Sequence, residues 1–91
     1  MANFAGIFGK NIYLDNKLVG YINAHGEVFI TNKKIGEFEV DGTLYRVDSN
    51  YEICYIEDNG DIYSNDEEVG YVDSNNNVHF YLEQFQKALK I

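Results

Sequence analysis

The chain of 91 residues contains no proline, no tryptophan and a single cysteine. One cysteine cannot form an intramolecular disulfide, which excludes the class of small secreted domains stapled by disulfides. No apolar run approaches the ~18 residues of a membrane-spanning helix. Residues 1–10 lack the basic segment that precedes the apolar part of a signal peptide. We therefore expect one cytoplasmic domain over residues 1–91, built on a single hydrophobic core.

Basic side chains are also scarce, with 7 Lys and Arg against 15 Asp and Glu and a net charge of −8. Such a balance argues against general nucleic-acid binding, which needs cations for the phosphates. The excess is local, because residues 47–86 contain no Lys or Arg whereas residues 1–46 are neutral overall. We call residues 47–86 the acidic sector. It either keeps a small domain soluble or docks a basic partner.

Catalytic and metal-binding motifs are missing as well. No glycine-rich phosphate loop and no GxSxG elbow occur. The spacing of Cys54, His25 and His79 places no base beside a nucleophile. Two histidines and one cysteine are too few for a zinc site without carboxylates, and the acidic run 66–68 lacks the EF-hand spacing. We predict a protein that is not an enzyme and that uses no metal and no cofactor.

What the chain does contain is an internal repeat. An aliphatic residue followed by a further strand former recurs at positions 12, 28, 44 and 62, a period of 16 residues with two extra in the third unit. Each is followed by an aliphatic-Gly-aromatic run such as Val19-Gly20-Tyr21 or Val69-Gly70-Tyr71. Unit two has Glu37 in the place of the aromatic residue, and unit three has Cys54 in the place of glycine. The small residue there predicts strands that approach too closely for a larger side chain.

Each unit predicts one β-hairpin, because short runs of strand-forming residues alternate with Asn, Asp and Gly turns. The expected units are about 11–25, 26–41, 42–59 and 60–76, with half-repeats at 4–8 and 77–81. The predicted fold is therefore mainly all-β, a pseudo-symmetric ring of four to five β-hairpins with about ten short antiparallel strands. The two half-repeats either pair with each other and close the ring, or remain edges that pair with another subunit.

The period changes after the last half-repeat. Apolar side chains at positions 82, 85, 88 and 89 fall at helical spacing, with Glu83 early and Lys87 and Lys90 late. This pattern predicts a C-terminal amphipathic helix over residues 82–90. Because so short a helix is unstable alone, we expect it to pack on the β core or to plug one end of the ring.

The candidate ligand-binding residues fall into two groups. One is a column that recurs at the same position of each unit, and it comprises Tyr13, Phe29, Tyr45, Tyr63 and His79. This column either pairs across strands or surrounds a ligand with aromatic rings. The second group is the basic cluster Lys33, Lys34 and Arg46, which suits an anionic ligand. Cys54 is expected to fill space in the core rather than to react.

The repeated hairpins with their second strand of the Val-Gly-Tyr-Ile type resemble the β-flower proteins, small bacterial and phage-type domains, over roughly residues 4–81. The resemblance implies an architecture of hairpins around a pseudo-rotational axis and brings no catalytic residues. A distant likeness of that family to tubby-type C-terminal domains implies a lipid-related role as one option. The predicted C-terminal helix departs from the bare hairpin ring and argues against an open axial channel.

These observations predict a small non-catalytic binding module, of which a viral (phage-type) accessory protein that sequesters a nucleotide-like ligand is one form. Its partner would be a small anionic ligand or a protein. The alternative is a structural domain that acts by self-association, as a homo-oligomer, or by docking a protein partner. Lipid-related binding is a weaker alternative, because anionic lipid would repel the acidic sector.

Overall fold

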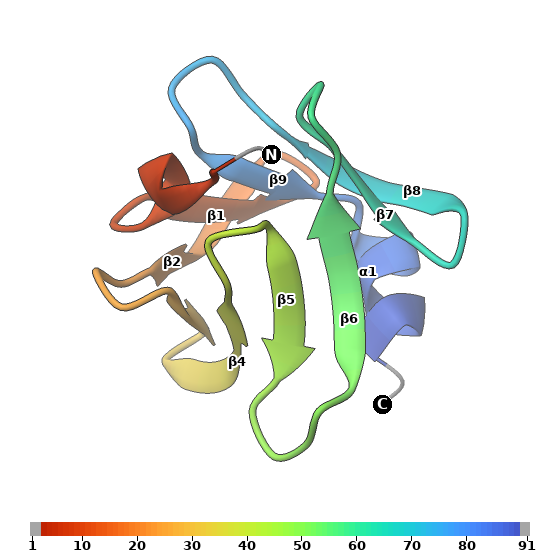
Figure 1. Cartoon of the computed structure of the whole chain (residues 1–91), viewed down its shortest axis with the longest axis horizontal. Helices are drawn as coiled ribbons and strands as arrows, with labels where there is room; N and C mark the ends of the chain where they lie inside the picture. The colour runs from red at the N-terminus through yellow and green to blue at the C-terminus, as the bar shows by residue number, and fades with distance from the viewer. Residues whose placement is uncertain (1–2, 90–91) are drawn as a thin grey trace.

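The computed structural model describes residues 3–89 and contains nine short strands, a 3₁₀ turn and one helix (Figure 1). The elements in chain order are η1 (Ala5–Ile7), β1 (Asn11–Leu14), β2 (Lys17–Ile22), β3 (Glu27–Ile30), β4 (Lys33–Phe38), β5 (Thr43–Arg46), β6 (Glu52–Ile56), β7 (Asp61–Ser64), β8 (Glu67–Val72), β9 (Val78–Phe80) and α1 (Leu82–Leu89). The helix matches the predicted one, and Lys90 lies outside the described residues.

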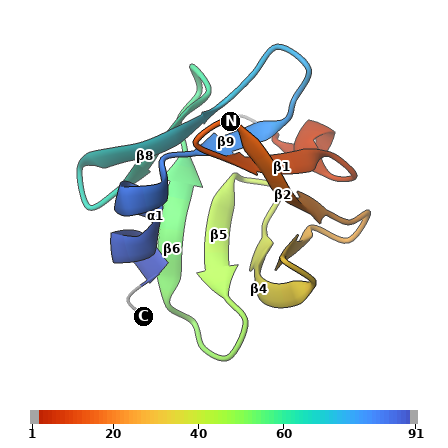
Figure 2. The ribbon, with the colours of Figure 1, turned by 180° about the vertical axis from the view of Figure 1, so that it is seen from behind.

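The strands form a closed barrel in which each pairs with the next in the sequence (Figures 1 and 2). The pairs β1–β2, β3–β4, β5–β6 and β7–β8 are the four predicted hairpins. The mainly β ring of hairpins with a C-terminal helix is thus confirmed, with nine strands in place of about ten. Closure removes the exposed edge that an open sheet would leave.

The predicted pairing of residues 4–8 with residues 77–81 is wrong. Residues 5–7 form the 3₁₀ turn η1, and the barrel closes where β9 pairs with β1 in parallel, with Ile12 opposite Val78. Because β1 and β9 are both first halves of a unit, they run in the same direction. With no second-half strand between them, a parallel pair is the only contact that closes the ring.

The hairpin turns follow from residues that tolerate positive φ. In hairpins one, two and four both central residues have φ between 46° and 70°, and these pairs are Asp15-Asn16, Thr31-Asn32 and Asn65-Asp66. Two consecutive residues of this kind form the tight turn whose twist matches antiparallel strands. We call the end of the barrel that carries these turns the hairpin end. The opposite end, where residues 23–26, 39–42, 57–60 and 73–77 join the units, is the linker end.

Every hairpin contains a β-bulge beside the small residue. In hairpin four the register shifts between Ile62 and Tyr63, so that Val69 is the extra residue. The bulge breaks simple alternation: Val69 is buried although Tyr71 is only half-buried. A Cβ on Gly70 would lie 2.0 Å from the carbonyl oxygen of His79. The glycine is therefore required by a close approach of the neighbouring strand, as the repeat predicted.

Apolar side chains fill the barrel interior. One residue from the first strand of each unit and one from β9 occupy equivalent positions and are fully buried, and we call this set the middle layer: Ile12, Val28, Leu44, Ile62 and Val78. Cys54 is buried in the same core, and burial, with a smaller contribution from the charge of Glu52, raises the pKa of its thiol. A buried, protonated thiol behaves as an apolar filler.

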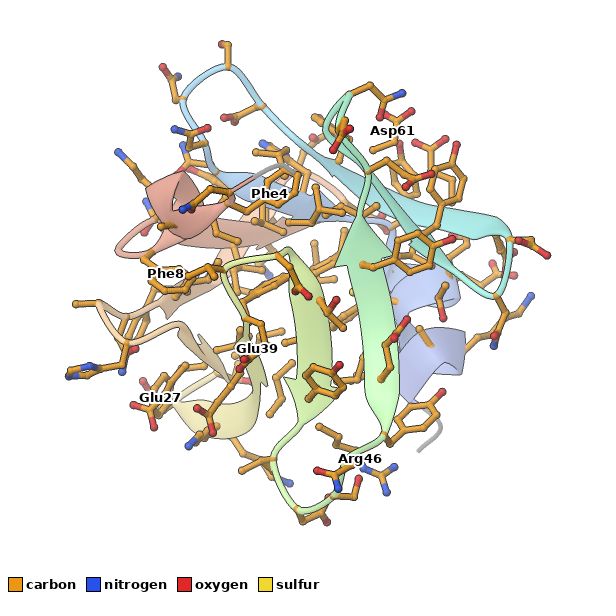
Figure 3. All side chains as sticks on the ribbon, in the orientation of Figure 1. Phe4, Phe8, Glu27, Glu39, Arg46 and Asp61 are labelled. Atoms are coloured by element: carbon orange, nitrogen blue, oxygen red, sulfur yellow. The ribbon has the colours of Figure 1, made fainter. Side chains whose placement is uncertain are left out.

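The two terminal segments cover the two ends of the barrel (Figures 1 and 2). At the linker end, Ile7 is buried and the rings of Phe4 and Phe8 pack against the core (Figure 3). At the hairpin end, α1 packs beside β6 and β8 and buries Phe85 and Ala88. Phe85 stacks on Phe80 with the ring centroids 4.0 Å apart. The helix thus rests on the core, as its apolar face predicted.

Candidate functional site

The predicted aromatic column lies on the outside of the barrel. Its members alternate with the buried middle layer and are all half-buried: Tyr13, Phe29, Tyr45, Tyr63 and His79. They pair sideways with residues of adjacent strands, for example Phe29 with Tyr21 at a centroid distance of 5.2 Å. A ring of side chains on the outer surface encloses no common space. The structure therefore does not bring the column together around one ligand.

One part of the column forms a continuous stack across the closing seam. The His79 ring lies between Tyr71 and Tyr13, with centroid distances of 4.6 and 4.8 Å. Its Nε2 atom is 2.8 Å from Oδ2 of Asp73, while Nδ1 is buried without a hydrogen-bond partner among residues 3–89. These contacts hold β9 between β8 and β1, which gives the stack a structural role in the seam.

Asp73 links this stack to the last linker. Its Oδ1 accepts hydrogen bonds from the backbone N–H groups of Asn75 and Asn77. Burial acts to raise the pKa of Asp73, but the hydrogen bonds from His79, Asn77 and Asn75 outweigh it and lower the pKa below its ordinary value. The ionised carboxylate is the form that these donors stabilise.

The three predicted cations do come together, at the hairpin end. Lys33, Lys34 and Arg46 line one open groove of about 630 Å³, which lies between α1 and the ends of the second and third hairpins. We call it the hairpin-end groove. Figure 3 places Arg46 beside the loop that joins β5 to β6. The remaining lining is mainly aliphatic, from Leu14, Ile30, Ile35, Val47, Leu82 and Leu89, and it is completed by Thr31, Asp48, Phe85 and Gln86.

The cations differ in how far they are already paired. Lys34 Nζ is 2.7 Å from Oε2 of Glu27 and 3.6 Å from Oε2 of Glu37, and the hydrogen bond to Glu27 raises the pKa of Lys34. Lys33 is exposed and makes no ion pair with any residue in the range 3–89. Lys34 is thus held by its own carboxylates, whereas the charge of Lys33 is available to a ligand.

Arg46 is fixed from two sides. Its Nε lies 3.1 Å from Oδ1 of Asp48, and its guanidinium lies 5.3 Å from the centroid of the Tyr51 ring. The Tyr51 hydroxyl in turn donates a hydrogen bond of 3.0 Å to the carbonyl of Ala88 in α1. This chain of contacts couples the arginine to the helix that forms the opposite wall. The terminal nitrogens of the guanidinium make no hydrogen bond among residues 3–89.

Sequence reasoning missed the aliphatic part of the groove. The helical spacing assigned Leu82 and Leu89 to the face that packs on the core, but Leu82 is 40% exposed and Leu89 is only half-buried. Val47, in the loop of the third hairpin, is 47% exposed. The sequence signal that could have shown this was the width of the apolar stripe, because an eight-residue helix on a barrel end cannot bury apolar residues on several sides.

The acidic sector presents a second distinct surface, on β6 to β8, around Asp61 in Figure 3. Tyr55 and Tyr63 lie with their ring centroids 6.4 Å apart, and Tyr81 donates a hydrogen bond to Glu68. Burial and the nearby carboxylates raise the pKa values of these three tyrosines. Their hydroxyls therefore stay protonated beside the negative charge.

Within residues 3–89, no group of three or more His, Cys, Asp or Glu side chains is placed to hold a metal ion. In the same range no helix has the length and apolar character needed to cross a membrane. No family model, no curated protein and no solved structure matches the chain.

Proposed function

We propose that the chain is a non-catalytic binding module and that its ligand is a small anion held in the hairpin-end groove. The observation that carries the proposal is the convergence of Lys33, Lys34 and Arg46 on one mainly aliphatic hollow. Its volume of about 630 Å³ falls within the range of roughly 300–1,000 Å³ that is usual for small-molecule sites. Arg46 and Lys33 come from different hairpins, so the site exists only in the folded barrel.

The other hollow beside Arg46 is a poorer candidate for an anion. It measures about 650 Å³ and is lined by Glu37, Glu39 and the ring of Tyr45, together with Arg46. Two carboxylates next to one guanidinium would repel an anionic ligand. The charge balance thus favours the hairpin-end groove.

The closed ring of repeated hairpins also supports membership of the β-flower architecture, which we propose for this chain. Architecture alone does not name a ligand. A nucleotide-like signal molecule, sequestered stoichiometrically by a phage-type accessory protein, belongs to the class of small anions that the groove would take. The first experiment therefore tests whether any small anion binds, before it asks which one.

The test is isothermal titration of the full chain with a panel of anions, namely inorganic phosphate, cyclic nucleotides and alkyl carboxylates. At least one should bind, and the double variant Lys33→Gln/Arg46→Gln should weaken it tenfold or more, because both neutralised groups face the groove. Lys17→Gln is the matched control, since Lys17 opens β2 as Lys33 opens β4 but does not line the groove. The proposal fails if no anion binds or if the double variant binds as well as the control.

A second candidate function rests on the acidic sector. Its tyrosines and its carboxylates on β6 to β8, which make no ion pair among residues 3–89, suit docking of a basic protein segment, since tyrosine is common at protein interfaces. We would measure binding of a lysine-rich peptide and its loss in Glu68→Gln/Asp61→Asn, together with the mass of the chain by light scattering. This candidate function is excluded if the protein is monomeric and does not bind the peptide.

A further inference from the structure

We infer that the ligand of the hairpin-end groove is an amphipathic anion, with a carboxylate or phosphate head and an unbranched aliphatic chain. This inference rests on the proposed function and names the class of its ligand. Lys33, Arg46 and the exposed side chains of Leu82 and Val47 meet in one hollow. A ligand that satisfies all of them needs one charged end and one apolar end.

The walls of the groove select an aliphatic chain over a flat base. Among the described residues that line it, Phe85 supplies the one aromatic ring. That ring is 2% exposed and stacked on Phe80, so it offers no free face. Nucleobases are usually held by stacking on an exposed ring. The branched aliphatic side chains of the walls instead pack well around methylene groups.

Burial of water-exposed apolar surface would drive the binding of an aliphatic chain in the groove. Five large apolar residues in the described chain are substantially exposed, and two of them, Leu82 and Val47, line this hollow. Around them lie side chains that are only partly buried against the core, namely Leu14, Ile30, Ile35 and Leu89. Single exposed apolar residues are common, but their grouping in a concave site marks a binding surface. An inserted chain would remove these groups from water together.

The head of the ligand has two donors available. Lys33 is unpaired among residues 3–89, and Arg46 uses Nε for Asp48 while its terminal nitrogens remain free of hydrogen bonds in that range. An ammonium and a guanidinium of this kind match the oxygens of a carboxylate or a phosphate. Lys34 is neutralised by Glu27 and Glu37, so the groove calls for a head of low charge rather than a polyphosphate.

Titration of the full chain with octanoate, decanoate and dodecanoate, each below its micellar concentration, tests the inference. Affinity should rise by roughly fourfold per added methylene until the groove is filled. Dodecyl phosphate should bind comparably, which would leave free acids and phosphate-headed lipids both as sources, and dodecyl trimethylammonium should bind at least tenfold more weakly. Equal binding of the cationic amphiphile would overturn the role given to Lys33 and Arg46.

Two matched variants test where the aliphatic chain of the ligand lies. Leu82→Gln should weaken dodecanoate by about fivefold or more and leave inorganic phosphate unchanged, whereas Leu18→Gln, at an exposed residue outside the groove, should change neither. Nuclear Overhauser contacts between the ligand chain and the methyl groups of Ile35 and Leu89 give the same answer without mutation. If cyclic nucleotides bind through Lys33 and Arg46 and no alkyl anion does, this inference fails and the proposed function stands. If no anion binds, both fail.

Discussion

The two ends of the barrel are covered by opposite ends of the chain, and they are covered differently. At the linker end the residues that flank η1 bond through their backbone to one linker and to the end of β2, with hydrogen bonds of 2.7 Å from Phe4 N to Val40 O and from Gly9 N to Ile22 O. A Cβ on Gly42 would lie 2.7 Å from the ring of Phe4, which shows how closely this cap fits. The hollow beside it measures about 310 Å³.

At the hairpin end the cap is a helix, and it leaves a hollow of about 630 Å³. A helix satisfies its backbone groups internally and holds its axis several ångströms away from its neighbours. It touches the hairpins through side chains and two hydrogen bonds, from Leu82 N to Asp15 and from Tyr51 to the Ala88 carbonyl. The closely fitted cap at the linker end therefore leaves the smaller hollow, whereas the helical cap leaves a groove of about twice that volume.

The largest effect on the free energy of unfolding is expected from Phe85, the buried aromatic residue of α1. Phe85→Ala should lower the free energy of unfolding by about 3–5 kcal/mol, because it removes a 2%-exposed ring and leaves a cavity. Leu82→Ala, one turn earlier and largely exposed, should cost less than about 1 kcal/mol. Urea unfolding measures both. Similar losses for the two variants would show that Leu82 is buried by the core and does not face a groove.

The cap at the linker end should be nearly as important. Ile7→Ala should lower the free energy of unfolding by about 2–4 kcal/mol, since Ile7 is 1% exposed and lies against the core. Ala5→Ser, at an exposed position of the same 3₁₀ turn, serves as the control and should be close to neutral. An Ile7→Ala loss below about 1 kcal/mol would contradict the tight fit assigned to this end.

A smaller effect is expected from the cap that the first hairpin gives to α1. Asp15→Gly removes the carboxylate that accepts the Leu82 N–H and keeps the positive φ of 46° at no steric cost. The loss should be about 1 kcal/mol, the usual value of an N-terminal cap. Asn65→Gly is the matched change in hairpin four, where the equivalent residue has φ of 51° and makes no hydrogen bond to residues 82–89 of the helix. Equal effects of the two variants in thermal unfolding would rule out the cap.

The smallest effect concerns pH at the linker end. Because the folded pKa of Asp73 lies below its ordinary value of 3.8, the carboxylate contributes stability above that value and loses it as pH falls through the folded pKa. Asp73→Asn should therefore show a shallower fall in unfolding free energy between about pH 5 and about pH 2. Asp58→Asn, in the exposed part of another linker, should keep the wild-type slope. An unchanged slope for Asp73→Asn would contradict the prediction.

The local pattern was sufficient for much of the fold. The four hairpins follow from strand-forming runs separated by Asn, Asp and Gly turns, and the close approach at Gly70 was readable from its recurrence. The burial of Cys54 was readable in the same way, because it replaces a small residue in the repeat. Each of these features depends on residues that are near in sequence or repeated at a fixed spacing.

Features that depend on packing between distant segments could not be predicted from the sequence pattern. The half-repeat at residues 4–8 resembles a strand, but its apolar side chains cover the linker end because the nine-stranded interior is already filled by the middle layer. The bulges likewise place Val69 in the core, which a simple alternation of faces along β8 would not do. Of the candidate site residues, Lys33, Lys34 and Arg46 meet at the groove, while the aromatic column is spread around the outside.

The 16-residue period determines by itself a series of four hairpins, and the distribution of charge determines that one half of the chain is acidic. Turn chemistry and alternation act over a few residues, so a sequence pattern contains them. Three features depend on which distant side chains compete for the same space. They are the parallel pairing of β1 with β9, the different caps at the two ends, and the grouping of three cations with an aliphatic wall. Only the tertiary structure decides that competition, because core volume and the width of a helix are properties of the assembled barrel.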